Sequence, residues 1–415
     1  MNMHGTYRTA SAGERGIAIS PSGIFTFLAA VVVILNSGYY RATASDSYLP
    51  LILLIGVAAV CLMFFHDRPI QADRKFIFVL LFAAGIGFSI LANFSTPNLL
   101  SGGRVFVTAL CCYVIIAKLE FDAFLKHFSR LMRIIIWAAF VLWVWANVMG
   151  APLPALKYGN YYDFFLVTMK VAGGRAMGVF WEPGVFASMV ILTMILELYF
   201  KKEKISLYRL VLYTVGVFLS GSTAGILILG ILLIAYLWRR WGLEKHWFPN
   251  LVFVVLVIFG ALYYEKVFEL LYDLNPDIFG KLMETTSETT ATRLNAPLVN
   301  LEIFLDSPVL GHGFTDAATL FADKMNVASD LNIVAQTSTS TQMMASVGIL
   351  GIAYTVGLVF PLFAGKKSGL GFVSRVAIAA IMLLVTNKEP HVYIALTWIM
   401  MFVFMMPAAQ EIEKK

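Results

Sequence analysis

Charged residues are scarce in this chain of 415 residues. Only 13% of the residues are Asp, Glu, Lys or Arg, whereas 59% are hydrophobic. Soluble domains carry about 25% charged residues, so a water-soluble fold could not cover this much apolar surface. Apolar runs recur from Ile17 to Met406, and most are long enough for a membrane-spanning helix. Barrel strands would be shorter and would alternate apolar and polar residues. The sequence therefore predicts an all-α polytopic membrane protein, with residues 1–415 in a single transmembrane domain.

Cysteine is almost absent as well. Cys61, Cys111 and Cys112 all lie inside apolar runs, and none has a CxxC spacing. A disulfide framework and a cysteine metal site are therefore not expected. The first apolar run is not followed by a small-residue cleavage site, so we expect a permanent helix there.

Twelve apolar segments are predicted to cross the membrane, and the linkers between them alternate in basic charge. Of the 31 Lys and Arg residues, 21 fall on the side that holds both termini. The excess of basic residues on cytoplasmic loops places both termini in the cytoplasm. The net charge of +6 is thus an orientation signal, and nucleic acid is not required to explain it. The predicted spans are roughly 18–37, 48–65, 76–93, 104–117, 133–149, 179–199, 206–220, 223–237, 248–264, 342–363, 370–386 and 392–408.

Two linkers on the outer side are sizeable, at about 150–178 and 265–341. The second contains eleven acidic and four basic residues, with helical apolar spacing over Pro297–Leu305. It is too long for a simple connection and is expected to fold as a small lid over the outer membrane surface. The seventh and eighth spans are short, since fifteen residues reach only about 22 Å of the roughly 30 Å core. Their turn, Ser220–Thr223, either lies below the surface or reflects local bilayer thinning.

The stretch Gly173–Ala187 lies where the first outer linker enters the sixth span. Glu182 falls at the start of an apolar run, where a carboxylate is costly unless it has a partner or faces water. Pro183 fits the first turn of a helix, so Glu182 is expected at a helix N-terminus that favours negative charge. A purely structural role for the Glu182 carboxylate, at a helix start near the membrane interface, is one alternative. Because Arg175 lies at the same entrance, we favour a functional role.

The large outer linker adds a basic candidate. Arg293 opens a predicted amphipathic helix that ends at Ser307-Pro308. From the residues alone, an ordinary salt bridge with a neighbour such as Glu288 is favoured over a binding role.

Two polar stretches near the C-terminus complete the candidates. The hydroxyl-rich stretch Thr337–Gln342 is expected to cap a helix. The last outer turn, Asn387–His391, holds Lys388, Glu389 and His391, and it is either a site or a polar turn.

The pattern R-x-x-G-x-F-x-x-P-x-x-F-A at Arg175–Ala187 resembles the bacterial O-antigen polymerase and O-antigen ligase superfamily. An outer-loop arginine about fifteen residues before S-P-x-L-G-x-G, here Arg293 before Ser307–Gly313, is similar as well. So is the hydroxyl-rich helix start before G-I-L-G. The resemblance covers about residues 173–352 and is only topological elsewhere.

The resemblance implies a GT-C-like inverting glycosyltransferase in the bacterial cytoplasmic (inner) membrane, with its active site facing the periplasm. It implies a donor oligosaccharide on undecaprenyl diphosphate, no cofactor and no metal. Two arginines would hold the diphosphate, here Arg175 and Arg293. The chemistry agrees, because a guanidinium keeps its charge and grips phosphate oxygens with two donors. The leaving diphosphate is a stable anion, so it needs electrostatic support more than a proton.

The acceptor hydroxyl needs a general base. In the ligase branch a histidine occupies the hydroxyl-rich helix start, where this chain has Thr337. This departure, together with the Glu-Pro-Gly at Glu182, favours the polymerase branch. The candidate bases are Glu182, then His312 and His391. Further substrate contacts are expected from Thr337, Ser338, Lys388, Tyr161 and Tyr162, although these tyrosines also fit an interfacial aromatic belt.

A polymerase would transfer the lipid-linked glycan onto an undecaprenyl-linked repeat unit, among membrane lipids and possible partners such as a chain-length regulator and a flippase. A ligase would use the same donor with another lipid acceptor. A twelve-helix secondary transporter is the alternative from another class, favoured by the span count and the charged linker His66–Lys75. Against it, the central linker is short, the largest loop lies outside and no half-repeat is visible. The sequence leaves open whether the product is lipopolysaccharide O-antigen, capsule or exopolysaccharide.

Overall fold

The computed structural model is a helical membrane protein. Its described residues are 21–39, 47–65, 68–70, 72–150, 156–158, 161–163, 174–200, 205–262, 266, 269–270, 272–273, 288–329, 336, 338–363 and 370–406.

A helix coincides with each predicted span. The first nine are α1 (Pro21–Leu35), α3 (Leu49–Phe64), α4 (Arg74–Ala92), α5 (Thr96–Lys118), α6 (Phe121–Asn147), α7 (Pro183–Tyr199), α8 (Leu207–Leu219), α9 (Thr223–Arg240) and α10 (Trp247–Leu262). The tenth is a series of short helices, α15 (Thr339–Val347), η2 (Gly348–Gly351), α16 (Ile352–Val359) and η3 (Phe360–Phe363), and it is followed by α17 (Phe372–Lys388) and α18 (Ala395–Phe404). Within the described chain, α4, α5, α6, α9 and the series Thr339–Phe363 are long and apolar enough to cross a membrane. The prediction of an all-α polytopic membrane protein is thus confirmed.

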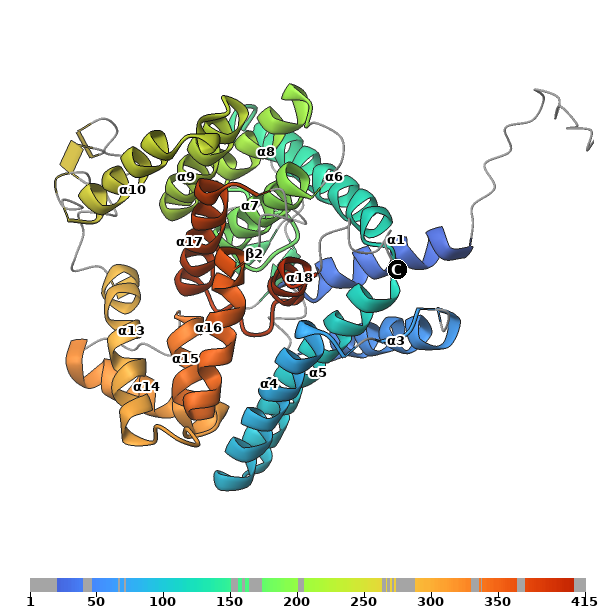
Figure 1. The fold of residues 1–415 in the computed structure, drawn as a ribbon, viewed down its shortest axis with the longest axis vertical. Coiled ribbons are helices and arrows are strands. Elements are labelled where there is room, and N and C mark those ends of the chain that lie inside the picture. Colours follow the sequence, from blue (N-terminus) through green and yellow to red (C-terminus); the bar gives the residue numbers. More distant parts are fainter. Residues whose placement is uncertain are drawn as a thin grey trace, which may run out of the picture.

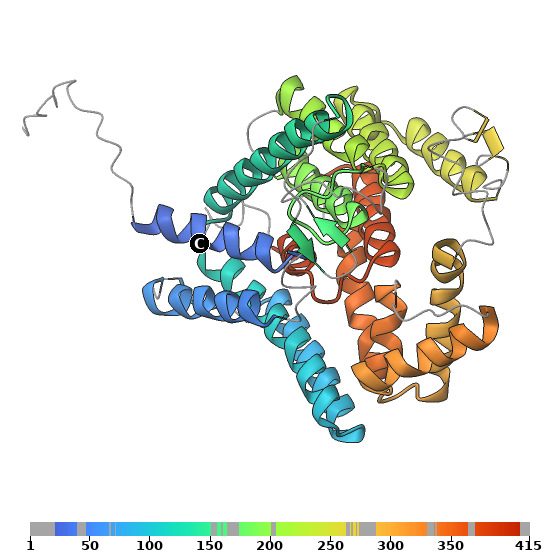
Figure 2. The ribbon, with the colours of Figure 1, turned by 180° about the vertical axis from the view of Figure 1, so that it is seen from behind.

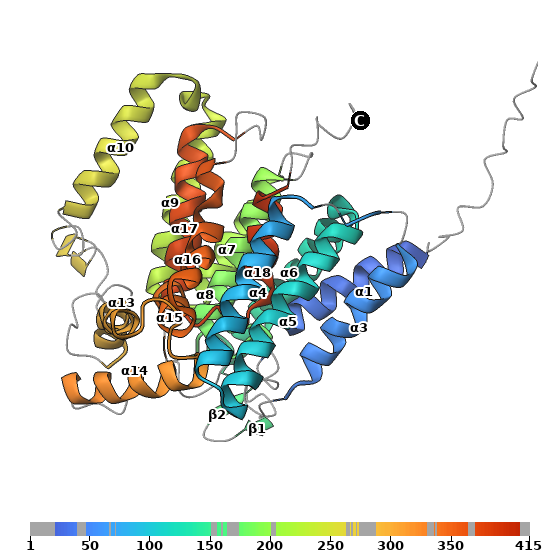
Figure 3. The ribbon, with the colours of Figure 1, turned by 60° about the horizontal axis from the view of Figure 1, so that its bottom comes forward.

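The connections gather at two ends of the bundle. We call the end that holds the starts of α7 and α15 and the α17–α18 turn (389–394) the loop end, and the opposite one the basic end. At the loop end, Trp181 N donates to the carbonyl of Gly38 at 3.1 Å, and Ala395 N donates to that of Asn36 at 3.1 Å. Figure 3 shows the β-hairpin and α14 at the loop end and the α9–α10 connection, with η1 (Leu243–Lys245), at the basic end.

The centre of the bundle is α7. Every residue from Pro183 to Glu197 in this helix is buried, so α7 has no lipid-facing stripe. A helix that is apolar all round belongs in the interior of a bundle. Figure 1 shows α7 near α17 and α18 in the middle, with α1 and α3 on one side and α13 and α14 on the other. The segment that leads into α7 is therefore held by a rigid scaffold.

The large outer linker contains two helices, α13 (Glu288–Asp306) and α14 (Phe314–Ser329), which we call the α13–α14 pair. They pack on α15 around a small core of their own, which includes Ala296, Ile303 and Phe321. Helix α13 ends just before Ser307-Pro308, as predicted. It begins before Arg293, so the arginine lies inside the helix and does not open it.

The first outer linker contains a short antiparallel hairpin of β1 (Leu156–Tyr158) and β2 (Tyr161–Asp163). Tyr158 pairs with Tyr161, and Leu156 pairs with Asp163. Figure 2 shows these strands as green arrows near the middle of the molecule when it is seen from behind.

Three predicted boundaries were wrong. The fifth span was placed at 133–149, but its helix α6 begins at Phe121. The fourth span was placed at 104–117, but α5 begins at Thr96, capped by Ser95 and with Pro97 in its first turn. A Cβ at Gly102 would lie 3.1 Å from Ile90, so the glycine lets α5 pack closely on α4. The eighth span is longer than expected, because α9 has 18 residues, whereas α8 has only 13 and reaches about 20 Å.

Candidate functional site

The predicted carboxylate lies at the start of α7. Glu182 is the N-cap residue with an extended backbone, and Pro183 occupies the first helical turn, as the sequence indicated. The Glu182 side chain makes no capping hydrogen bond to α7. It is half-buried. Its carboxylate thus does not cap the helix, as an N-cap side chain usually does.

A second carboxylate comes to the same place from the far end of the sequence. A Cβ placed on Gly184 would lie 2.5 Å from Oε1 of Glu389 and 3.8 Å from Oε1 of Glu182. Glu389 follows the last residue of α17 and is 3% exposed. The missing side chain at Gly184 therefore makes room for a carboxylate pair. A carboxylate at this place could act as a general base toward a bound hydroxyl group.

Two cationic side chains flank this pair through the α8–α9 turn. Lys388 is 7% exposed, and its Nζ donates to Oγ of Ser222 at 3.3 Å. Arg175 lies against the neighbouring Gly221, where a Cβ would meet the arginine Cδ at 2.6 Å. The segment that contains Arg175 is held by Ala176 N, which donates to the carbonyl of Leu219 at 2.8 Å. Positive charge thus borders the carboxylates at the loop end.

The hydroxyl-rich start of α15 binds the α17–α18 turn. Oγ1 of Thr339 donates to the carbonyl of Glu389 at 3.2 Å and accepts from His391 N at 2.8 Å. Oγ of Ser338 donates to Oδ1 of Asn387 at 3.1 Å. Ser338 is the N-cap residue, yet its side chain makes no capping bond to α15. The expected capping role was therefore wrong for Ser338, because the hydroxyls serve to hold the turn.

His391 lies inside the turn and outside the spanning helices. Its side chain is 0% exposed, and its Nδ1 is hydrogen-bonded with Oγ1 of Thr397 at 2.9 Å. Nε2 is buried without a hydrogen-bond partner among the described residues. Burial, with a smaller contribution from the charge of Lys388, lowers the His391 pKa to about 3. The imidazole is thus neutral at physiological pH.

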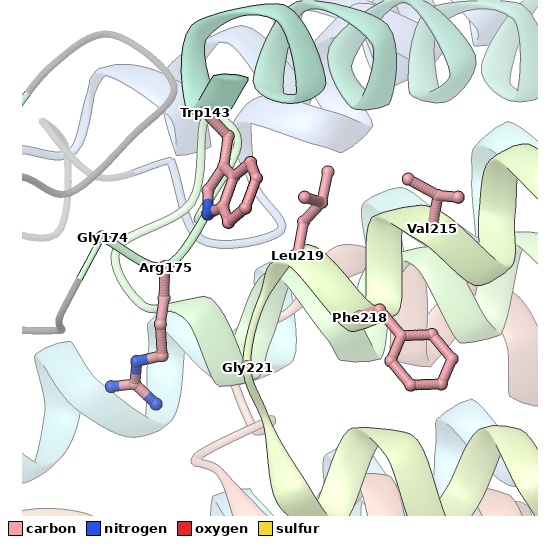
Figure 4. Close-up of a pocket in the computed structure, with 7 residues that line it drawn as sticks. All are labelled: Trp143, Gly174, Arg175, Val215, Phe218, Leu219 and Gly221. Atoms are coloured by element: carbon pink, nitrogen blue, oxygen red, sulfur yellow. The ribbon is translucent and has the colours of Figure 1, made fainter. Parts of the chain in front are cut away.

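A cavity of about 410 Å³ opens beside Arg175. Its other lining residues are mostly apolar and come from α6 and α8, namely Trp143, Val215, Phe218 and Leu219, with Gly174 and Gly221. Figure 4 shows the guanidinium of Arg175 extending away from the side chains of Val215, Phe218 and Leu219. We call this cavity the α6–α8 pocket. It joins an apolar wall to a fixed positive charge, which suits an amphiphile with an anionic head.

Other predicted site residues lie apart from this cluster or outside the description. His312 is held in the α13–α14 connection, where its Nε2 donates to the carbonyl of Ile303 at 3.1 Å. Its backbone N donates to Ala345, about 9 Å along α15 from Thr339. Arg293, Tyr161 and Tyr162 are placed by their backbone alone. Thr337 lies outside the described residues.

No group of three His, Cys, Asp or Glu side chains suited to a metal ion occurs within the described ranges. Glu389 was noticed in the sequence only as part of a polar turn. Thr339 and Ser222 were noticed only as parts of polar stretches. A polar residue next to a helix end is common, so the sequence carried no signal that separated these residues from ordinary turns.

Comparison with known families matches residues 209–359 to the family described as O-antigen ligase. A comparison with curated proteins found no match. The matched range includes Arg293, Ser307–Gly313 and the start of α15, but neither Arg175–Ala187 nor the α17–α18 turn. Members of the family are glycosyltransferase-like enzymes that act on lipid-linked oligosaccharides. The resemblance seen in the motifs is thus confirmed over this range, and the match supports the O-antigen polymerase and ligase superfamily without distinguishing its branches.

Proposed function

We propose that the chain is a polysaccharide polymerase of the bacterial cytoplasmic membrane. It transfers a glycan from undecaprenyl diphosphate onto an undecaprenyl-linked repeat unit at the loop end, which faces the periplasm. The observation that carries this proposal is the meeting of Glu182 and Glu389 at Gly184, between Lys388 and the α6–α8 pocket. A base and an anion-binding arginine at one place are what glycosyl transfer from a lipid diphosphate needs.

The α6–α8 pocket holds the donor. Its apolar wall suits the isoprenoid chain, and Arg175 at its edge binds the diphosphate with paired N–H donors. Arg293 supplies the second positive charge from α13. It precedes Ala296 and Asn300 by one and two helical turns, and both of those residues are fully buried against α15 or its neighbours. Arg293 thus occupies the helical face that is turned toward the bundle.

The reaction is an inverting displacement. The acceptor hydroxyl oxygen forms a bond to the anomeric carbon while the bond from that carbon to the diphosphate oxygen breaks. The electron pair leaves with the diphosphate, whose charge the arginines offset, and the hydroxyl proton passes to Glu182. The negative charge of Glu389 lies next to Glu182, and the positive charge of Lys388 offsets part of the charge of the two carboxylates. His391 is too deeply buried to reach the acceptor and acts by positioning the turn.

The ligase branch is the second candidate, because the matching family is described as O-antigen ligase. The acceptor would then be a glycolipid without an undecaprenyl carrier. The chain has no histidine in the stretch 336–342, which favours the polymerase. The family match also favours a glycosyl-transferring enzyme over a transporter. A chain-length regulator and a flippase remain proposed partners.

The test is a purified assay in which undecaprenyl diphosphate-linked repeat units are the only substrate. Wild type is expected to make a ladder of products on a gel. Arg175→Ala, Arg293→Ala and Glu182→Gln are expected to lose it at least 100-fold, as for a lost catalytic group. Arg240→Ala at the exposed basic end and Lys324→Ala in the α13–α14 pair are the matched controls, and they should retain it.

Three outcomes decide between the candidates. A ladder that survives both arginine substitutions would contradict the diphosphate clamp. Transfer to a supplied core glycolipid without a ladder would establish the ligase. If neither product is formed, the transporter becomes the favoured candidate.

A further inference from the structure

Arg104 is a charged residue within a membrane-spanning helix. Because α5 begins at Thr96, Arg104 lies two turns, about 12 Å, inside the helix. A charge at such a position is costly and is usually retained for function. The predicted boundary of this span had hidden the feature by placing Arg104 at the membrane surface.

The neighbours of Arg104 are aromatic and hydroxylated. Its guanidinium carbon lies 4.6 Å from the centre of the Tyr393 ring and 5.8 Å from that of Tyr48. No carboxylate lies within 4 Å of it among the residues that the structure describes. Ring faces offset part of a cation's charge but accept none of the five N–H donors in the usual sense. Among the described residues, no side chain accepts a hydrogen bond from Arg104, which leaves its donors open to an anion there.

A second cavity, of about 400 Å³, opens at this arginine. Tyr48, Thr96, Ser101 and Tyr393 contribute to its lining together with Arg104, and we call it the α5 pocket. It resembles the α6–α8 pocket in size and in having a single arginine. It differs in its hydroxyl groups, which the wall of the first pocket lacks.

The two pockets lie near different ends of the α17–α18 turn. At one end of this turn, Lys388 binds Ser222, the neighbour of Gly221 in the α6–α8 pocket. At the other end, Tyr393 lines the α5 pocket, two residues after His391. Glu389 lies between these contacts. The proposed base is therefore flanked by two cavities, each of which has its own arginine.

We propose that the α5 pocket binds the diphosphate of the second lipid substrate, the acceptor. This proposal rests on the proposed polymerase function, in which two lipid diphosphates must reach one base together. Arg104 would bind the diphosphate, and the tyrosine rings and hydroxyls would contact the sugar next to it. The acceptor glycan then extends across the turn toward Glu182 and Glu389, while the donor approaches from the α6–α8 pocket.

The test counts bound carriers by native mass spectrometry of the full chain released from lipid nanodiscs. The probe is undecaprenyl diphosphate, with undecaprenol as the uncharged lipid and inorganic diphosphate as the free anion. Wild type is expected to retain two molecules of undecaprenyl diphosphate. Arg104→Gln and Arg175→Gln should each retain one, with about a tenfold weaker affinity for the site that was altered. Arg104→Lys should restore part of the second site.

The controls distinguish a lost binding site from a misfolded protein and from binding of the free anion. Arg240→Gln, which removes an arginine that donates to Tyr236 at the basic end, should retain both carriers. Retention of the carrier at the Arg175 site shows that Arg104→Gln is folded. Inorganic diphosphate that binds as well as the lipid would overturn the lipid site.

A wild type that retains one carrier, or an Arg104→Gln variant that retains two, would overturn the proposal even if a product ladder is made. Two carriers without any ladder would instead refute the polymerase function. In an active preparation, Arg104→Gln should slow ladder formation about tenfold, because the acceptor diphosphate loses a charged donor.

Discussion

The two ends of α7 each hold a glutamate. At the basic end, Glu197 is 1% exposed, and its Oε1 lies 2.6 Å from Nη1 of Arg133 and 3.6 Å from Nη1 of Arg209. At the loop end, Glu182 is half-buried and shares the space above Gly184 with another carboxylate, Glu389. One buried charge is matched by two cations, whereas the other is brought next to a like charge. The first arrangement maintains the fold. The second is the place where the proposed mechanism puts its general base.

The largest expected effect is on stability at the basic end. Glu197→Gln leaves two arginines without their carboxylate, and breaking a buried ion cluster costs about 3–5 kcal/mol of unfolding free energy. Glu182→Gln should change this free energy by less than about 0.5 kcal/mol. Denaturant unfolding in detergent measures both.

Glu302→Gln is the control for this comparison, because its carboxylate pairs with Lys324 at 2.5 Å but is 62% exposed. A surface pair of this kind contributes about 0–1 kcal/mol. If Glu197→Gln costs no more than Glu302→Gln, the two ends of α7 do not differ in the way described.

The next effect concerns activity at the loop end. Gly184→Ala adds one methyl group where a Cβ would lie 2.5 Å from Oε1 of Glu389, so it separates the carboxylates. We expect glycosyl transfer to fall about tenfold, since moving a catalytic carboxylate by about 1 Å can slow a reaction at least that much. Product formation per folded molecule is the measurement.

Gly230→Ala in α9 is the matched variant, because nothing lies within 4 Å of a Cβ there. Replacing glycine by alanine inside a helix stabilises it by about 0.5–1 kcal/mol. Equal activity in the two alanine variants would show that the carboxylate pair has no role in transfer.

The last expected effect is the pH dependence of stability. The folded-state pKa of His391 is about 3, below its unfolded value of about 6.5, so unfolding takes up a proton between these values. The contribution is fully present above pH 6.5 and falls by up to about 1.4 kcal/mol per pH unit as the pH is lowered toward 3. Melting temperatures measured from pH 7 to 4.5 should show this decline.

His391→Asn should flatten that decline, whereas His246→Asn at the exposed basic end should not. An unchanged slope in His391→Asn would mean that the turn opens to water in solution.

The spans were predictable because apolar length is a local property. Each run that was long enough became a helix. The start of α5 was misplaced because Thr96–Gly103 is polar and rich in small residues, and only its packing on Ile90 of α4 explains why it is helical. A boundary set by a neighbouring helix is not visible in the run itself.

The site was predictable in part. Glu182 stood out because a carboxylate began an apolar run. Its meeting with Glu389 joins residues about two hundred positions apart, and it depends on the missing side chain at Gly184. Arg104 was hidden by the misplaced boundary. Local chemistry thus indicated the candidates, but the packing of α7, α15 and α17 decides which of them meet.

Besides packing on α15, the α13–α14 pair is fastened along one edge by the connection between its two helices. Asn93 Nδ2 donates to the carbonyl of Gly311 at 3.0 Å, and Asn98 Nδ2 donates to Asp316 at 2.8 Å. Gly311 touches the backbone of Ser346 so closely that no side chain could fit between them. Rocking about this edge would make α13 a lever, with Arg293 about 20 Å from the pivot. A tilt of about 10° would move that residue by roughly 3 Å, enough to break the hydrogen bond to phosphate that we propose for it.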